Sequence, residues 1–492
     1  MIETTSALIW PILITGLAPL AIWLFRENIN VREGVSLVAG AITFAIVLSF
    51  VPPVLDGKIL IYPLFQILPG IEIKLCVDGL TLIFAIVASF LWMLATFYNI
   101  GYMRSLNEHA QTRYYFCFGV AIFGAVGVAM SGNIFTLYFF YEVITVFTYP
   151  LVAHHQDAES YHGARKYLVY LMGTSKLFLL PAMILTYVLC GTLDFHLGDM
   201  VTGIFPPDAN PLLVQITYGL YVAGLAKAAI MPLHNWLPSA MVAPTPVSAL
   251  LHAVAVVKAG VFSVSRVLLS GFGVNLMDSL GLGFVTACFA AFTIVVASCI
   301  ALTKDDLKAR LAYSTVSQLS YIVLGVAMLT PMAVTGGLAH IAHHAFSKIT
   351  LFFAAGAIYV VTHQKKISLL HGVGRRMPWT FGAFAVASLS MIGVPPVCGF
   401  VSKWYMVNGA VNSHQYIFLA ALLASTLLNA SYFTPVIYKA FFYPAAEGVD
   451  LSKYSEAPMT MVVPLCFTAA MSVFLGLYPE TFFQFINAFR GH

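Results

Sequence analysis

The sequence predicts an all-α polytopic membrane protein with about fourteen transmembrane helices. Three observations predict this class. Of the 492 residues, 60% are hydrophobic and 9% are charged, whereas about 25% of residues in an average soluble domain are charged. The mean hydropathy of the chain is +0.88. Apolar runs of about 20 residues, the length that crosses the hydrocarbon core, recur from one end of the chain to the other.

The expected spans follow one another through short loops, and no loop is long enough to form a soluble domain. We therefore expect a single membrane domain over residues 1–492. The first span is long enough to stay in the membrane rather than to be cleaved as a signal peptide. The spans are expected near residues 5–25, 33–53, 78–100, 113–131, 133–153, 166–190, 212–232, 245–270, 280–303, 312–330, 335–361, 379–410, 416–442 and 459–478.

The distribution of lysine and arginine predicts the orientation of these spans. If the N-terminus lies outside, fifteen of the 24 basic residues fall in inside loops, three fall outside and six fall within spans. Basic residues accumulate in cytoplasmic loops of membrane proteins. The bias favours an outside N-terminus and an even number of spans.

Several functional classes lack support in the sequence. The seven cysteines are scattered and form no CxxC pair, so we expect no metal, cluster or disulfide framework. A net charge of +4 without a basic face gives no reason to expect nucleic acid as a partner. We find no cofactor motif and no redox or hydrolytic site in the chain.

The stretch 224–260 places ionisable groups inside apolar sequence, next to four prolines. Proline breaks the helical ladder, and in lipid a broken backbone is tolerated only inside protein or beside a wet cavity. We therefore expect two membrane helices with an interruption that faces an internal polar space. The ionisable residues of this stretch are Lys227, His234, His252 and Lys258.

Glu142 is the acidic residue that lies well inside an expected span, and Lys227 is its candidate partner. An intramembrane charge usually faces the bundle interior and has a partner or a function. Burial disfavours the charged lysine and a nearby carboxylate favours it, so a pair that opens and closes can control a proton. A static ion pair between two helices is the alternative. For His252, a hydrogen-bonded core histidine is the alternative.

His340, His344 and Lys348 recur every four residues and therefore line one face of one helix. A row of titratable groups is what a proton relay requires, and histidine titrates near neutral pH. A zinc site is the competing interpretation, but the sequence has no HExxH glutamate and no carboxylate nearby. His343 points elsewhere and is expected to be structural.

A second proline break, at Pro395 and Pro396, precedes Lys403. The first break and this one lie in separate halves of the chain, a pattern typical of inverted-repeat transporters. Three further charged residues need an account. We expect Arg266 to reach the outer interface and Asp78 to cap a helix, and we assign no role to Lys176.

Four motifs together resemble a known family. PLHNWLPSAMVAPTPVSALLHA, LAYSTVSQLSYIVLG, HIAHHAFSKITLFF and GVPPVCGFVSKW are similar to the antiporter-like subunits shared by Mrp-type multisubunit cation/proton antiporters and respiratory complex I. The likeness extends from about Asp78 to the end of the penultimate span and is greatest to the D-type component of the Mrp antiporters.

This resemblance implies fourteen spans, two inverted five-helix repeats and discontinuous helices seven and twelve. It divides the chain into 1–112 (helices 1–3), 113–270 (first repeat, helices 4–8), 280–442 (second repeat, helices 9–13) and 443–492 (helix 14). It also implies a multi-pass protein of a prokaryotic cell membrane with other membrane subunits as partners. The family's functional residues correspond to Glu142, Lys227, His252, Lys258, His340, His344, Lys348 and Lys403.

We therefore expect a proton-translocating subunit that passes protons along water chains between these residues. A monovalent cation such as Na⁺ would cross elsewhere in the assembly. The alternatives are a proton-pumping subunit of a quinone reductase or membrane hydrogenase, a proton channel in a CO₂ or bicarbonate uptake complex, and a passive scaffold. At least five buried ionisable residues argue against a scaffold.

Overall fold

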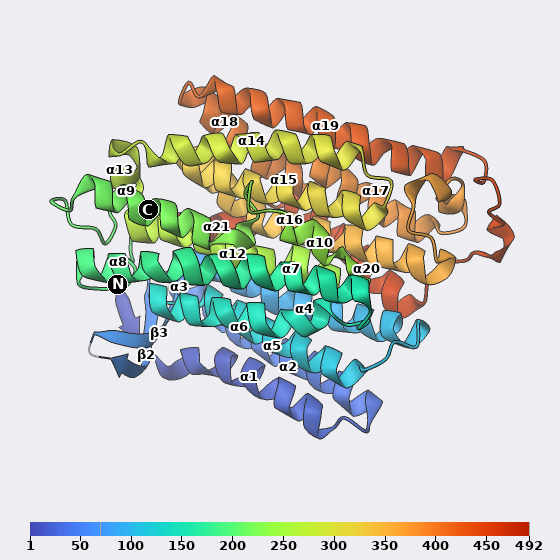
Figure 1. The fold of residues 1–492 in the computed structure, drawn as a ribbon, viewed down its shortest axis with the longest axis horizontal. Helices are drawn as coiled ribbons and strands as arrows, with labels where there is room; N and C mark the ends of the chain where they lie inside the picture. The colour runs from blue at the N-terminus through green and yellow to red at the C-terminus, as the bar shows by residue number, and fades with distance from the viewer. Residues whose placement is uncertain (69, 492) are drawn as a thin grey trace.

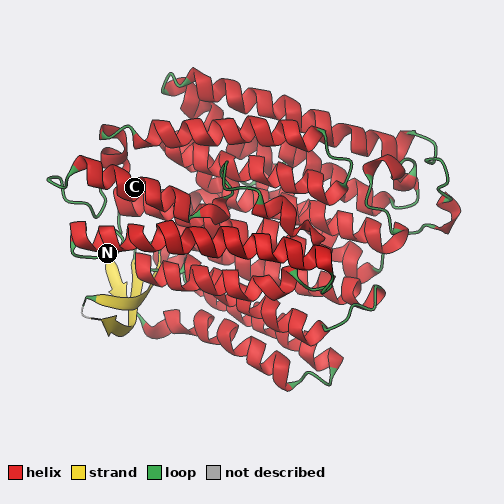
Figure 2. Cartoon of the chain, in the orientation of Figure 1, coloured by secondary structure: helices red, strands yellow, loops and turns green. Residues whose placement is uncertain are grey.

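We analysed a computed structural model of the chain, which describes residues 1–68 and 70–491. Long helices lie side by side and run along the length of the molecule (Figure 1). Helices dominate the fold, and a small sheet lies at one end beside the N-terminus (Figure 2). The protein is thus a helical, polytopic integral membrane protein, as the composition predicts.

Eleven helices within the described residues are long and apolar enough to cross a membrane. The other three expected spans, near 212–232, 312–330 and 379–410, fall on helices that proline shortens or that polar residues make less hydrophobic. The last of these expected spans is divided between α17 (Pro378–Ile392) and α18 (Cys398–Asn412). Length and composition therefore identify the helices of Glu142, Lys258 and His344, but not the shorter helices that end or begin beside Lys227 and Lys403.

The N-terminal part of the chain contains a sheet that the expectation of an all-α protein did not include. Strand β2 pairs in parallel with β1, with Ile2 opposite Ile59, and antiparallel with β3, with Leu60 opposite Val77. Strands β2 and β3 connect the second and third expected spans outside the helical bundle, whereas β1 precedes the first expected span. The elements are β1 (Ile2–Thr4), α1 (Ile9–Leu24), α2 (Ile29–Ser49), α3 (Val51–Leu55), β2 (Ile59–Leu68), β3 (Ile71–Val77) and α4 (Gly79–Ser105).

The middle of the chain contains the first interrupted helices. A π-helical turn at Ser175–Leu179 joins α7 to α8, and another at Leu250–Val254 joins α11 to α12. The helices are α5 (Gln111–Ala129), α6 (Ile134–Val152), α7 (Ala158–Thr174), α8 (Leu180–Cys190), α9 (Pro211–Gly224), α10 (Trp236–Ser239), α11 (Thr245–Ala249), α12 (Val256–Arg266) and α13 (Val274–Ser279).

The remaining helices surround α16, which has 32 residues. Its neighbours include α15, α17, α18 and α20, and α4 from the N-terminal part of the chain also packs against it. The other helices of this part are α14 (Leu282–Leu302), α15 (Leu307–Ala327), α16 (Pro331–Thr362), α19 (Tyr416–Phe442), α20 (Met459–Leu477) and α21 (Glu480–Arg490).

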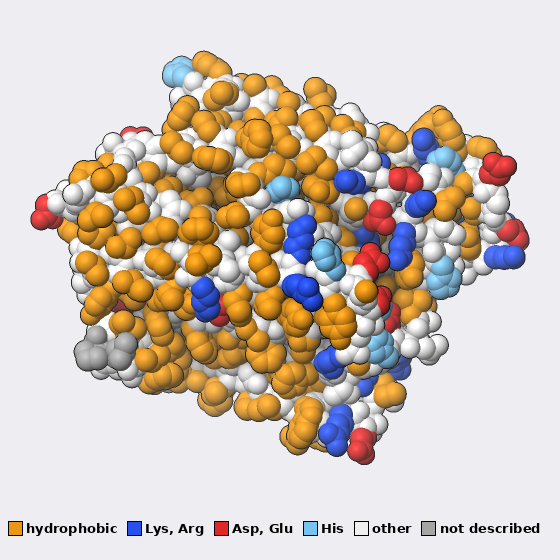
Figure 3. All heavy atoms as spheres, viewed as in Figure 1, with side chains coloured by type: hydrophobic (Ala, Val, Ile, Leu, Met, Phe, Trp, Pro, Cys, Tyr) orange, Lys and Arg blue, Asp and Glu red, His pale blue; other side chains and the backbone are white. Residues whose placement is uncertain are grey.

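Charged side chains gather toward one end of the molecule, whereas apolar side chains cover most of the rest of the visible face (Figure 3). Large apolar side chains such as Trp10, Leu17 and Leu427 are each more than half exposed. A broad apolar belt with charges beyond it is the surface that a bilayer requires. The end that carries the charges includes the loops from α4 to α5 and from α19 to α20 (Figure 1).

Candidate functional site

Helix α16 carries the row of polar residues that the four-residue spacing predicts. His340, His344 and Lys348 are all fully buried on this helix. Each contacts a different set of partners from neighbouring helices, so α16 brings several elements to one polar centre. Thr330 caps the helix by accepting a hydrogen bond from the Ala333 amide, which fixes where the long helix begins.

A direct contact joins Lys258 on α12 to His344 on α16. The Lys258 Nζ atom lies 2.8 Å from the His344 Nδ1 atom, and both residues are fully buried. His252 lies in the π-helical turn before α12, where its ring packs against Phe352 with centroids 4.7 Å apart. Neither ring nitrogen of His252 has a hydrogen-bond partner among the described residues, so the alternative of a hydrogen-bonded core histidine is not supported.

His340 has a partner on each ring nitrogen. Its Nδ1 lies 2.7 Å from the Ser402 hydroxyl on α18, and its Nε2 lies 3.0 Å from the Gln318 side-chain oxygen on α15. Further along α16, Lys348 donates to the Ser314 hydroxyl at 3.0 Å. The row on α16 therefore contacts α12, α15 and α18.

Lys403 caps the C-terminal end of a half-helix. Its Nζ atom donates to the carbonyl oxygens of Met391 at 2.6 Å and Ile392 at 3.1 Å, which end α17. Carbonyls at a helix C-terminus lack partners within the helix, and the helix dipole favours a positive charge there. Gly393 follows with φ of +93°, so the break that the prolines predict is present at this point.

The carbonyl oxygen of Met391 links Lys403 to the rest of the polar centre. It also accepts hydrogen bonds from the side-chain amides of Gln318, at 3.4 Å, and Asn429, at 3.1 Å. Because a carbonyl accepts hydrogen bonds but has no proton to donate, it positions these groups without itself passing a proton on.

From Asn429 the hydrogen bonds continue back toward α16. The hydroxyl of Tyr432 donates to the Asn429 side-chain oxygen and lies 3.1 Å from the Ser314 hydroxyl. Ser314 in turn accepts from Lys348. Lys348 and Lys403 therefore lie at two ends of one buried network built from α15, α16, α17, α18 and α19.

Lys227 occupies the first helix break. Helix α9 ends at Gly224, and Lys227 lies in the short turn that follows it. Its Nζ atom donates to the Tyr141 carbonyl at 2.6 Å and to the Thr145 hydroxyl at 2.8 Å, and it lies 3.1 Å from the centroid of the Tyr141 ring. Helix α12 touches this turn at Gly260, where a Cβ atom would lie 2.3 Å from the carbonyl carbon of Lys227.

The predicted direct pair between Glu142 and Lys227 is wrong in this structure. Glu142 pairs instead with Lys176, whose Nζ lies 3.4 Å from the carboxylate and donates to Tyr138 at 2.6 Å. The reason is helical geometry, because neighbouring residues on α6 point about 100° apart. Lys227 binds the face of Tyr141, and Glu142 faces the π-helical turn of Lys176. Such turns often occur at functional sites.

The prediction that Arg266 reaches the outer interface is also wrong. Arg266 is fully buried, and its guanidinium donates to both carboxylate oxygens of Asp78, at 2.5 and 2.7 Å. The prediction that Asp78 caps a helix is confirmed, because its side chain accepts from the Thr81 amide at 2.9 Å. Asp78 thus caps α4 and also pairs with Arg266 on α12.

A cavity of about 800 Å³ opens at the end of the molecule that carries the charges. It lies between the ends of α4, α7 and α16, and Tyr102, Glu108, His155, Lys308 and Lys365 are among the residues that line it. Partial burial lowers the pKa of His155 below its ordinary value. The cavity gives water a place to approach the bundle from this end.

Comparison with known proteins places the chain in a family. The model of the family described as NADH:quinone oxidoreductase/Mrp antiporter, transmembrane region, matches residues 131–429. The chain belongs to this family. The match includes Glu142, Lys227, Lys258 and Lys403, which are residues of the site described above.

Relatives of this family member come from more than one kind of complex. This chain is 33% identical over 430 residues to NADH-quinone oxidoreductase subunit N of Desulforudis audaxviator, with 84% of this chain and 83% of the relative covered. It is 30% identical over 461 residues to the A/B component of a probable K⁺/H⁺ antiporter of Rhizobium meliloti, with 91% of this chain covered. This family member spans 45% of the length of the Rhizobium chain.

Solved structures show the same fold. A chain of the membrane-bound sulfane sulfur reductase, an archaeal respiratory membrane complex, matches with a TM-score of 0.85 at 25% identity, covering 98% of this chain and 96% of that one. A chain of the Mrp complex from Dietzia matches with a TM-score of 0.85 at 20% identity, covering 99% and 97%. The family member is therefore an antiporter-like subunit, of a type found in Mrp and in complex I-type assemblies.

Sequence reasoning missed the uncharged members of the network. Gln318, Asn429 and Tyr432 are polar groups within apolar spans, and this placement was a signal that could have identified them. The role of Lys176 could not be predicted, because its contact with Glu142 depends on the π-helical turn that rotates it.

Proposed function

We propose that the protein conducts protons through the membrane as one subunit of a multisubunit monovalent cation/proton antiporter. Protons pass by way of Glu142, Lys227, Lys258, His344 and Lys348 to Lys403. The transported cation, Na⁺ in the simplest case, crosses in another part of the assembly. His252 and His340 support the path by orienting water and neighbouring side chains.

The contact between Lys258 and His344 carries this proposal. An ammonium donates a proton and a neutral imidazole nitrogen accepts one, so a 2.8 Å separation allows the proton to be shared or transferred. The second nitrogen of His344 has no hydrogen-bond partner among the described residues, which leaves it free to release the proton onward. A buried imidazole nitrogen without a partner is unusual, because buried polar groups are normally hydrogen-bonded.

Glu142, together with Lys176 and Lys227, controls the proton affinity at the start of the path. In the described structure Glu142 is paired with Lys176, while Lys227 is held by neutral oxygen atoms. If Glu142 moves toward Lys227, its negative charge favours the charged lysine, and if it returns to Lys176 that support is lost. The pairing of Glu142 therefore raises or lowers the proton affinity at the start of the path.

A second candidate function is proton pumping within a complex I-type oxidoreductase. The identity of 33% with an NADH-quinone oxidoreductase subunit N, over 83% of that subunit, favours it. Both functions use the same proton path and differ in the partners. Purification of the complex and identification of its other chains separates them, because small antiporter subunits indicate Mrp and dehydrogenase or hydrogenase subunits indicate the oxidoreductase.

The topology that we propose has fourteen spans with the N-terminus outside the cell membrane. It contains two five-helix repeats over 113–270 and 280–442, broken near Lys227 and Lys403. The position of Lys227 within the first break and the contact of Lys403 with the second support this pairing of halves. In this orientation the end rich in basic residues, which carries the cavity, faces inside.

The test uses vesicles from a strain without its own antiporters that carry the complete complex. Lys258→Met should abolish proton-linked Na⁺ exchange, while Lys366→Met, which changes an exposed lysine on a loop, should leave it intact. Both variants must assemble to the same level as the original complex. Exchange at the original rate in an assembled Lys258→Met complex would rule the path out.

A further inference from the structure

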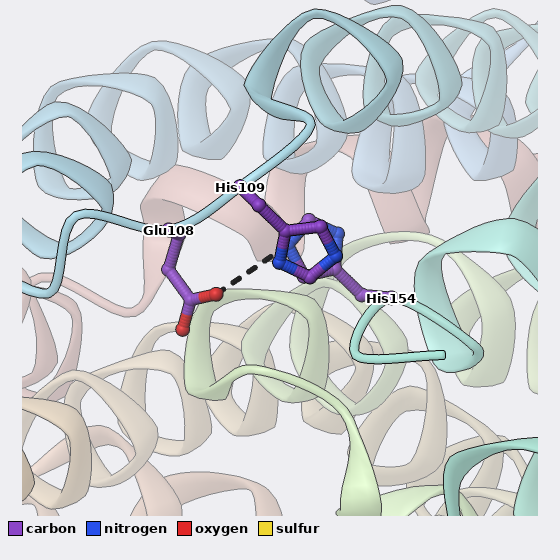
Figure 4. A group of neighbouring side chains, drawn as sticks. All are labelled: Glu108, His109 and His154. Atoms are coloured by element: carbon purple, nitrogen blue, oxygen red, sulfur yellow. Dashed lines mark ion pairs between the residues drawn. The ribbon is translucent and has the colours of Figure 1, made fainter. Parts of the chain in front are cut away.

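Two histidines and a glutamate meet at the end of the bundle that carries the charges, outside the path described above. Glu108 and His109 lie in the loop from α4 to α5, and His154 lies just after α6 (Figure 4). One possible ligand atom from each residue lies within 4.8 Å of the other two. The His154 Nε2 atom is 3.5 Å from the Glu108 carboxylate, and His155 Nδ1 is 3.8 Å from the same oxygen.

His154 is the residue that points to a missing ligand. Its side chain is fully buried, yet its Nδ1 atom has no partner among the described residues and its Nε2 atom has only the long 3.5 Å contact with Glu108. A buried polar group without a partner is costly. The ring cannot easily turn away, because it packs between His109, at a centroid distance of 4.8 Å, and Tyr114, at 5.9 Å. Arg113 also holds the backbone carbonyl of His154, at 3.0 Å.

The donor set selects the class of ligand. Imidazole nitrogens with one carboxylate suit Zn²⁺ and similar transition metals, whereas Mg²⁺ and Ca²⁺ prefer oxygen atoms. Zinc–ligand bonds of about 2.0–2.1 Å place ligand atoms about 3.3 Å apart in a tetrahedral site. The three groups therefore need to approach by roughly 1 Å or more. Glu108 and the exposed His109 lie on the loop from α4 to α5, so this approach requires a shift of that loop, and His155 is close enough to serve as a fourth ligand.

We propose that Glu108, His109 and His154 bind a divalent transition metal of the zinc class. The bound metal ties the loop from α4 to α5 to the turn between α6 and α7. Because Glu108 and His155 also line the cavity, the metal lies in the cavity wall. This site does not depend on the proton path, so metal binding can be measured whether or not the complex transports ions.

The experiment measures Zn²⁺ binding to the purified whole complex, prepared with a tag that lacks histidine and stripped with a chelator. A competing fluorescent chelator reports affinity. The original protein should bind one equivalent of Zn²⁺. His109→Ala and His154→Ala should each lower the affinity for that Zn²⁺ by more than about tenfold. His371→Ala is the matched control, because His371 is a partly buried histidine in another loop, packed against Tyr443.

Because His109 is exposed, its replacement removes no buried side chain and is not expected to prevent folding. As a second readout, Co²⁺ bound in place of Zn²⁺ should give visible absorption bands that disappear in His109→Ala. Zinc affinity that is unchanged in His109→Ala, or no equivalent bound by the original protein at micromolar Zn²⁺, overturns the proposal.

Discussion

Gly260→Ala should disrupt the first helix break without touching an ionisable side chain. A Cβ atom at this position would lie 2.3 Å from the carbonyl carbon of Lys227 and 2.4 Å from the Ala228 amide nitrogen. Ordinary contacts between such atoms are about 3.5 Å. The two backbones must therefore separate by roughly 1 Å, because neither contact is with a flexible side chain. Overpacking of this kind costs about 1–3 kcal/mol of stability.

The functional effect should exceed the effect on stability. Lys227 is held by bonds of 2.6 and 2.8 Å to Tyr141 and Thr145, and a shift of 1 Å breaks or lengthens both. A displacement of that size can reduce a rate by about a hundredfold. We therefore expect proton-linked exchange in vesicles to fall between about tenfold and a hundredfold per assembled complex.

Gly271→Ala is the matched control for this variant. Gly271 is also buried and lies beyond the same helix, but a Cβ atom there would meet its nearest neighbour, Val267 Cγ1, at an ordinary 3.8 Å. This variant should exchange at the original rate. If Gly260→Ala assembles and exchanges as fast as Gly271→Ala, the position of the first break does not matter, and the reasoning is refuted.

Three further predictions concern the other contacts. Lys176→Met removes the partner of Glu142, so the proton affinity of Lys227 should change, and the exchange rate should change with it. An unchanged exchange rate in vesicles would show that the pair of Glu142 and Lys176 is only structural. Asp78→Asn leaves the buried Arg266 without its carboxylate and should destabilise the protein by about 3–5 kcal/mol in detergent unfolding; a loss below about 1 kcal/mol would contradict this. Gly393→Ala forces a side chain to φ of +93° and should lower stability by about 1–2 kcal/mol, whereas an unchanged unfolding curve would argue against strain at the second break.

The helical class and the α16 row could be predicted because they depend on local spacing. Apolar runs of span length identify the helices, and residues four apart must share a helix face. The proline-rich positions of the two breaks followed from the same local chemistry. In each case the information lies within one segment of the chain.

The partners across helices could not be predicted, because they depend on how helices rotate against one another. Glu142 was expected to face Lys227, but one step of the helix and one π-helical turn direct it to Lys176. The bidentate contact of Arg266 with Asp78 joins residues 188 apart in the sequence. The strands β2 and β3 were hidden in a loop between two strong spans.

A structure of the whole complex with ordered water resolved tests the proton path most directly. The path predicts waters within hydrogen-bond distance that join Lys227 to Lys258 and reach the unpartnered nitrogens of His252 and His344. From His344 they should continue toward Lys348 and Lys403. If these gaps are instead filled by apolar side chains, with each lysine in a separate dry pocket, the account is contradicted.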